Sequence, residues 1–165
     1  MPVEVLIEEE AWNVQGLRRI SLEAFREVML YFEYDQSEFE VSILGCDDKK
    51  IKALNEGFLL KDSATNVLSW PARERRPEIA GTPPTRLDHT IDIFVGDIAI
   101  SYETCWHEAT EVGKNFALHV SHLLIHGMLH LMGFDHQNDA DATVMEGIET
   151  EILGKMGMDV QYVAL

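Results

Sequence analysis

The chain has 165 residues, 46% of them hydrophobic, which is enough for one globular domain with a buried core, and we expect a single domain over residues 1–165. The formal net charge of −16 argues against general nucleic-acid binding, because phosphate recognition depends on Lys and Arg. We find no secretory signal, no bilayer-length apolar run and only two distant cysteines, Cys46 and Cys105, so we expect a cytoplasmic protein with reduced core thiols and no membrane or DNA partner.

Hydrophobic spacing predicts strands and helices that partly alternate along the chain. Strands are expected over residues 3–7, 39–44, 66–70, 90–95 and 97–101, the last two on either side of Gly96, where a tight turn or a bulge is expected. Helices are expected over residues 13–32, 47–58, 103–112, 116–132 and 139–155. These elements predict an α+β fold, an α/β sandwich, in which a mixed sheet of about four strands is covered by about five helices.

One segment of the chain is basic although the chain as a whole is acidic. Residues 49–86 hold eight basic and four acidic side chains, a net charge of +4, and the remaining residues have a net charge of −20. Charge alone favours a solvated loop and helix face for this segment. It includes the one long loop, residues 72–89, and loops of that length in compact domains are usually functional or disordered.

The run from His126 to His136, His-Gly-Met-Leu-His-Leu-Met-Gly-Phe-Asp-His, has the spacing of a three-ligand zinc site. His126 and His130 are four residues apart and therefore share one face of the predicted helix. Gly133 can end that helix with a positive φ and bring His136 round to the same face. Three imidazoles without a fourth protein ligand are typical of a catalytic site. We predict one Zn²⁺ per chain on these histidines, although nickel, copper or iron would also suit them.

The histidines of this helix also allow roles other than metal binding. A histidine on an apolar helix face is more often a core residue than a ligand, and packing or a cap is the role we prefer for His119 and His122. For His122, four residues before His126, contact with a ligand is the alternative. Zinc proteases share the ligand spacing, but the residue after their first histidine is a glutamate that acts as general base. Here that residue is Gly127, so a metallopeptidase is the less favoured alternative.

Two further segments accompany the histidine run in a fixed order. They are Leu-Asn at 54–55 followed by Thr-Asn-Val-Leu-Ser-Trp-Pro at 65–71, and Gly-Asp-Ile-Ala-Ile-Ser at 96–101. Together the three elements resemble the YbeY family of bacterial ribosomal-RNA maturation factors, whose signature is His-Gly-x-Leu-His-Leu-x-Gly-x-Asp-His. The resemblance spans essentially the whole chain. It implies a metal-dependent, single-strand-specific endoribonuclease in 16S ribosomal-RNA maturation and ribosome quality control, with ribosomal RNA and ribosomal particles as partners.

The chain departs from the family pattern at one position. An arginine follows an aromatic residue in the family, whereas here Phe58 is followed by Leu59. The resemblance implies that this arginine lies beside the metal and stabilises charge. Two alternatives follow: another cation, Lys61 first but also Arg73 or Arg86, reaches the same cleft, or the protein is a non-catalytic or weakly catalytic metal-binding ribosome-assembly factor.

The expected chemistry runs through the metal held by His126, His130 and His136. A zinc-activated water would attack a phosphodiester while the metal and a nearby cation stabilise its oxygens; attack by the 2′-hydroxyl of the RNA is the alternative. Asp135 either orients a histidine ring or is a turn residue, and the two are equally weighted. The basic segment around Trp70 is the predicted RNA-facing side, although a tryptophan in a strand is more often a core residue.

Overall fold

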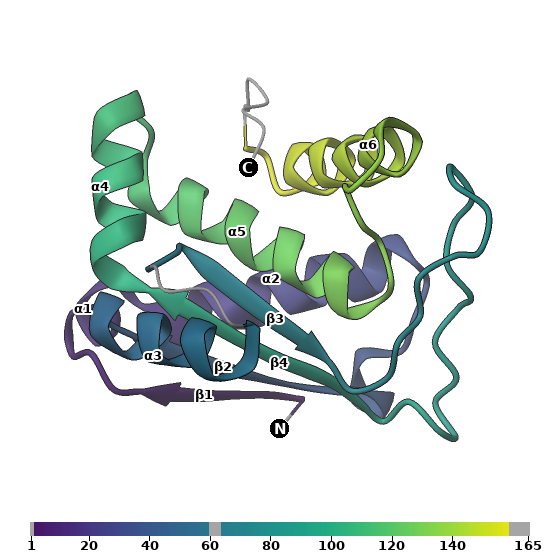
Figure 1. Cartoon of the computed structure of the whole chain (residues 1–165), viewed down its shortest axis with the longest axis horizontal. Coiled ribbons are helices and arrows are strands. Elements are labelled where there is room, and N and C mark those ends of the chain that lie inside the picture. The colour runs from purple at the N-terminus through teal and green to yellow at the C-terminus, as the bar shows by residue number, and fades with distance from the viewer. Residues whose placement is uncertain (1, 60–63, 159–165) are drawn as a thin grey trace.

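A central four-stranded sheet organises the computed structural model, which describes residues 2–59 and 64–158. Strands β1, β2 and β4 run parallel to one another, and the edge strand β3 runs antiparallel to β4 (Figure 1). The expected mixed sheet and α+β class are therefore confirmed. In spatial order the strands are β1 (Val3–Ile7), β2 (Glu40–Cys46), β4 (Phe94–Ser101) and β3 (Val67–Pro71).

Helices cover the sheet unequally. Helices α2 and α5 pack together on one face, with α6 lying over both, and α3 packs against β4 from the other face (Figure 1). No described helix is both long and apolar enough to span a membrane. The helices of the described residues are α1 (Ala11–Gln15), α2 (Leu17–Tyr31), α3 (Asp48–Leu59), α4 (Tyr102–Val112), α5 (Phe116–Leu131) and α6 (Asp139–Lys155), with a short 3-10 helix η1 (Gln36–Glu38).

The alternation of side chains along the strands creates two apolar cores. Ile43 of β2 and Ile98 of β4 face the larger core beneath α2 and α5. Cys46 and Ala99 point to the opposite face and pack with Ile51 of α3 in a smaller core. Both cysteines of the chain are buried and free, as predicted.

Two sequence predictions about element boundaries were wrong. The helix expected over residues 13–32 is broken at Gly16, whose φ of 75° ends α1 and starts α2. The strands expected over 90–95 and 97–101 form the single strand β4, which starts only at Phe94. The anomaly at Gly96 is a bulge, because Glu40 pairs with Phe94 and Val41 with Gly96. A β-carbon at Gly96 would collide with the backbone oxygen of Trp70, so the bulge requires glycine.

Candidate metal centre

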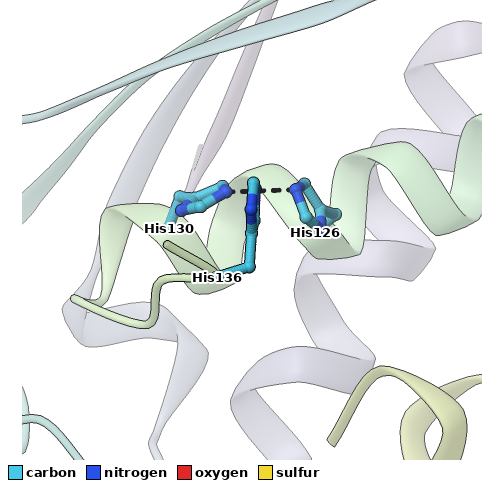
Figure 2. A group of neighbouring side chains, drawn as sticks. All are labelled: His126, His130 and His136. Carbon is cyan, nitrogen blue, oxygen red and sulfur yellow. Dashed lines mark hydrogen bonds between the residues drawn. The ribbon is translucent and has the colours of Figure 1, made fainter. Parts of the chain in front are cut away.

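Helix α5 and the turn after it bring three histidines together. His126 and His130 lie one helical turn apart with their Nε2 atoms 3.0 Å from each other. The chain turns back after the helix so that the ring of His136 meets both, and Figure 2 shows the three rings grouped beside α5. One ring nitrogen from each histidine lies within 4.8 Å of the others. The three-histidine group predicted from spacing is therefore present.

Glycine is required at the turn. Gly133 has φ of 105°, and its N–H donates to the carbonyl of His130 while that of Phe134 donates to Leu129, which ends α5 in a left-handed cap. A β-carbon at Gly133 would lie 2.5 Å from the backbone oxygen of Arg75. The absence of a side chain thus permits both the turn and the close approach of the 72–89 loop.

The second ring nitrogen of each helical histidine is held by a hydrogen-bond acceptor. Nδ1 of His126 donates to the carboxylate of Glu149 at 2.5 Å, and Nδ1 of His130 donates to the carbonyl of Phe134 at 2.9 Å. A neutral imidazole that donates from Nδ1 has its lone pair on Nε2. The two Nε2 atoms lie 3.0 Å apart, close to the roughly 3.3 Å expected for two nitrogens on one tetrahedral zinc ion, so they can share a proton or a metal ion. This donor set fits a metal cation.

Burial determines the charge of these groups. Burial and the two neighbouring histidines lower the pKa of His130 to about 4, so the ring is neutral at pH 7, as a metal ligand must be. Burial acts to raise the pKa of Glu149, but hydrogen bonds from His122 and His126 outweigh it and lower the pKa to about 2. The site thus places the neutral ring of His130 next to His126, which has a fully buried carboxylate behind it.

The histidines line a cleft of ≈ 550 Å³ that runs between α5, its following turn and β3. His126 is buried, His130 is partly buried and His136 is exposed, so the cleft opens to solvent at His136. The remaining wall includes Glu74 and Arg76 from the loop after β3. The cleft therefore leaves one side of the three-histidine group open to solvent.

Comparison with known proteins places this arrangement in a family. The family model described as Endoribonuclease YbeY matches residues 5–157. The chain belongs to the Endoribonuclease YbeY family. Proteins named Endoribonuclease YbeY from Ruegeria sp. (strain TM1040) and Jannaschia sp. (strain CCS1) are 45% and 41% identical to it, covering 99% and 98% of this chain and 97% and 100% of those proteins. The solution structure of TM1509 from Thermotoga maritima shares the fold, with a TM-score of 0.53 at 20% identity over 94% of this chain and 91% of that one.

Glu149 is the most prominent residue of this YbeY-family site that the sequence analysis missed. It lies on α6, thirteen residues beyond the histidine run, and is fully buried. A signal was present in the sequence, because Glu149 occupies the same helical stripe as the buried Met145 and Ile152. A charged residue at a core position of a helix needs a partner, and here the partner is a histidine of the cleft.

The other histidines of α5 lie outside the three-histidine group. Nε2 of His119 pairs with Glu108 at 3.0 Å. His122 is completely buried, with Nε2 3.9 Å from Glu149 and Nδ1 3.3 Å from Nζ of Lys114. Both side chains are packed within the protein, as predicted. His122 is connected to the three-histidine group through Glu149, which also accepts from His126.

Two further residues singled out from the sequence have different outcomes. Oδ1 of Asp135 accepts the backbone N–H of His136 at 2.7 Å, a turn-type bond, and its Oδ2 lies 3.3 Å from Nε of Arg76. Lys61, the first choice for a substitute cation, lies outside the described residues. Leu59, at the position where the resemblance implied an arginine, is the last residue of α3.

Three arginines of the basic segment contact other parts of the chain. Arg73 and Arg75 both pair with the buried Asp92, and hydrogen bonding from Arg75 lowers the pKa of that carboxyl. Arg86 donates to the carbonyl of Phe32 at 2.8 Å. Trp70 packs with the smaller core, on the face of the sheet opposite α5 and its histidines. The placement of Trp70 therefore fits the core alternative better than base stacking at the cleft.

Proposed function

We propose that this chain is a zinc-dependent endoribonuclease that hydrolyses single-stranded ribosomal RNA during 16S maturation and ribosome quality control in the cytoplasm. The observation that supports it best is the pair of Nε2 atoms of His126 and His130, which face each other at 3.0 Å beside His136. Because Nδ1 of each ring is engaged by another acceptor, both Nε2 atoms can bind the same cation. Family membership supplies RNA as the substrate class.

The residues of the cleft prepare the site for hydrolysis. A zinc ion held by the three histidines would supply Lewis acidity, which makes hydroxide available near neutral pH and offsets charge on a phosphodiester. Glu149 and the carbonyl of Phe134 keep protons on Nδ1 of their histidines, which leaves both Nε2 atoms free to coordinate. Burial keeps His130 neutral, so protons do not compete for this ligand at pH 7.

A glycine distinguishes this cleft from that of a peptidase with the same ligand spacing. Gly127 lines the cleft next to His126, and a β-carbon there would lie 3.3 Å from Cδ1 of Ile98. The side chain that serves such peptidases as general base is missing. Hydrolysis of RNA depends less on that base, because a phosphodiester requires mainly charge stabilisation.

Ribosomal particles are the proposed partners of the chain. The rival proposal is a metal-binding ribosome-assembly factor with little or no catalysis, and Leu59 in place of the family arginine favours it. The two proposals agree on metal binding and differ on whether RNA is cut.

The decisive experiment is cleavage of small-subunit ribosomal RNA by the purified protein, with zinc content measured on each sample. His130→Ala should lose most zinc and most cleavage, while His107→Ala, at an exposed histidine of α4, should retain both. Stoichiometric zinc without cleavage in the native protein would reject the nuclease in favour of the assembly factor. Cleavage that persists in fully metal-depleted His130→Ala would reject the metal-dependent mechanism.

A further inference from the structure

Among the described residues, one basic side chain lines the histidine cleft, and it is Arg76. Its side chain is 52% exposed, and Nε lies 3.3 Å from Asp135, the residue directly before His136. Nη1 lies 3.4 Å from the amide oxygen of Gln137 on the other side of His136. The guanidinium therefore spans the mouth of the cleft beside the most exposed histidine.

The preceding residue fixes the position of Arg76. The side chain of Arg75 is 3% exposed and forms a two-pronged pair with Asp92, which is also buried. Its backbone oxygen meets Gly133 at the turn that carries the histidines. Arg75 thus holds the 72–89 loop against the turn at Gly133, and the side chain of Arg76, the next residue, reaches the cleft.

The contacts of Arg76 are too weak to account for its placement by stability alone. Exposed ion pairs such as that with Asp135 contribute about 0–1 kcal/mol. A guanidinium has five N–H donors in a planar fork, and phosphate oxygens match that fork better than a single carboxylate oxygen does. Among the described residues, Arg76 contacts its neighbours through Nε and Nη1, and its Nη2 amino group can donate to another acceptor.

We propose that Arg76 binds a phosphodiester of the RNA substrate beside the three histidines, in a role for which the sequence suggested Lys61, Arg73 or Arg86. The proposal rests on the RNA-cleaving function proposed above. Without Arg76, the carboxylates of Glu74 and Asp135 would repel the substrate at the cleft mouth. With it, one of those charges is neutralised and donors are presented to the phosphate.

Arg73 provides a matched control on the same loop. Its side chain is 53% exposed, and it also pairs with an aspartate, at 3.0 Å from Asp92. It does not line the histidine cleft. Arg73→Gln and Arg76→Gln therefore remove the same charge from the same loop, and only the second removes it from the cleft.

The test measures cleavage of single-stranded RNA by zinc-loaded native protein, Arg76→Gln, Arg76→Lys and Arg73→Gln. Arg76→Gln should lower kcat/KM about 10- to 100-fold, the usual range for losing a hydrogen bond to a charged group, with zinc content unchanged. Arg76→Lys should recover part of the loss because it keeps the charge without the fork. Arg73→Gln should stay within about twofold of the native protein.

A binding measurement provides a readout that does not depend on cleavage. Fluorescence anisotropy with a labelled single-stranded RNA and metal-free protein should show a slope of log Kd against log salt reduced by about 0.7 in Arg76→Gln alone. If the native protein cleaves RNA but Arg76→Gln and Arg73→Gln have equal cleavage rates and equal salt slopes, the proposed role of Arg76 is wrong and the proposed nuclease activity stands. A native protein that cuts no RNA would overturn both proposals.

Discussion

Replacing Glu149 by Gln should weaken zinc binding without unfolding the protein. Glutamine keeps the shape and an acceptor oxygen for Nδ1 of His126, but it removes the buried negative charge. Hydrogen bonds from His122 and His126 outweigh burial and lower the pKa of Glu149 to about 2, so the carboxylate is charged beside the zinc ligand.

Changing the hydrogen-bonding partner of a metal ligand typically costs 10- to 100-fold in metal affinity, and because glutamine keeps an acceptor oxygen we expect the lower end, about tenfold. The assay is competition with a chromophoric chelator at pH 7.5, run on Glu149→Gln and on Glu151→Gln. Glu151 lies on the same helix, is exposed and accepts a hydrogen bond from Tyr31, so its variant should bind zinc like the native protein. Identical zinc affinities for all three proteins would refute the argument that the carboxylate sets the tautomer and basicity of His126.

Three other perturbations have calculable outcomes. Gly133→Ala should destabilise the protein by more than about 2 kcal/mol in urea unfolding, because φ is 105° and the methyl group would lie 2.5 Å from a backbone oxygen. Its control is Gly57→Ala, on a helix with open space around the new methyl group, which should be neutral or stabilising. In metal-free protein the pKa of His130 is about 4, against about 6.5 in the unfolded chain. This difference contributes up to about 3 kcal/mol to the free energy of unfolding, fully present above pH 6.5 and lost as the pH falls towards 4. A free energy of unfolding that stays constant between pH 7 and pH 5, measured in the presence of a chelator, would contradict this. Burial raises the pKa of Cys46 to about 12 and that of Cys105 well above 9, so neither thiol should react with iodoacetamide at pH 8 until the protein is unfolded, and rapid labelling of the folded protein would show the burial to be wrong.

Local patterns in the sequence were sufficient for much of this structure. The predicted helix over residues 139–155 agrees with α6, because Asn138 is its N-cap and Lys155 is the basic residue of its last turn. The three-histidine group was also predictable, since helical spacing and one glycine determine where the rings point. Gly96 was harder, because a bulge and a turn have the same glycine signature and only pairing with β2 distinguishes them.

Interactions between distant parts of the chain were not predictable in this way. The pairing of Arg75 with Asp92 crosses a loop of sixteen intervening residues, and nothing in the local sequence distinguishes Arg75 from Arg76. The contact of Glu149 with His126 joins two helices whose packing is set by the whole core. Order and direction of the strands likewise depend on which faces the helices cover, so only the fold class could be anticipated.

The tight approach of Gly127 to Ile98 has a consequence for the versatility of this scaffold. Even a methyl group at that position would press on the sheet at 3.3 Å, and the carboxylate of a glutamate is far larger. Placing a glutamate at position 127 would therefore also require Ile98 to move or to be replaced by a smaller residue. The contact between α5 and β4 thus links a residue of the sheet to the side chain that the cleft can carry beside its first histidine.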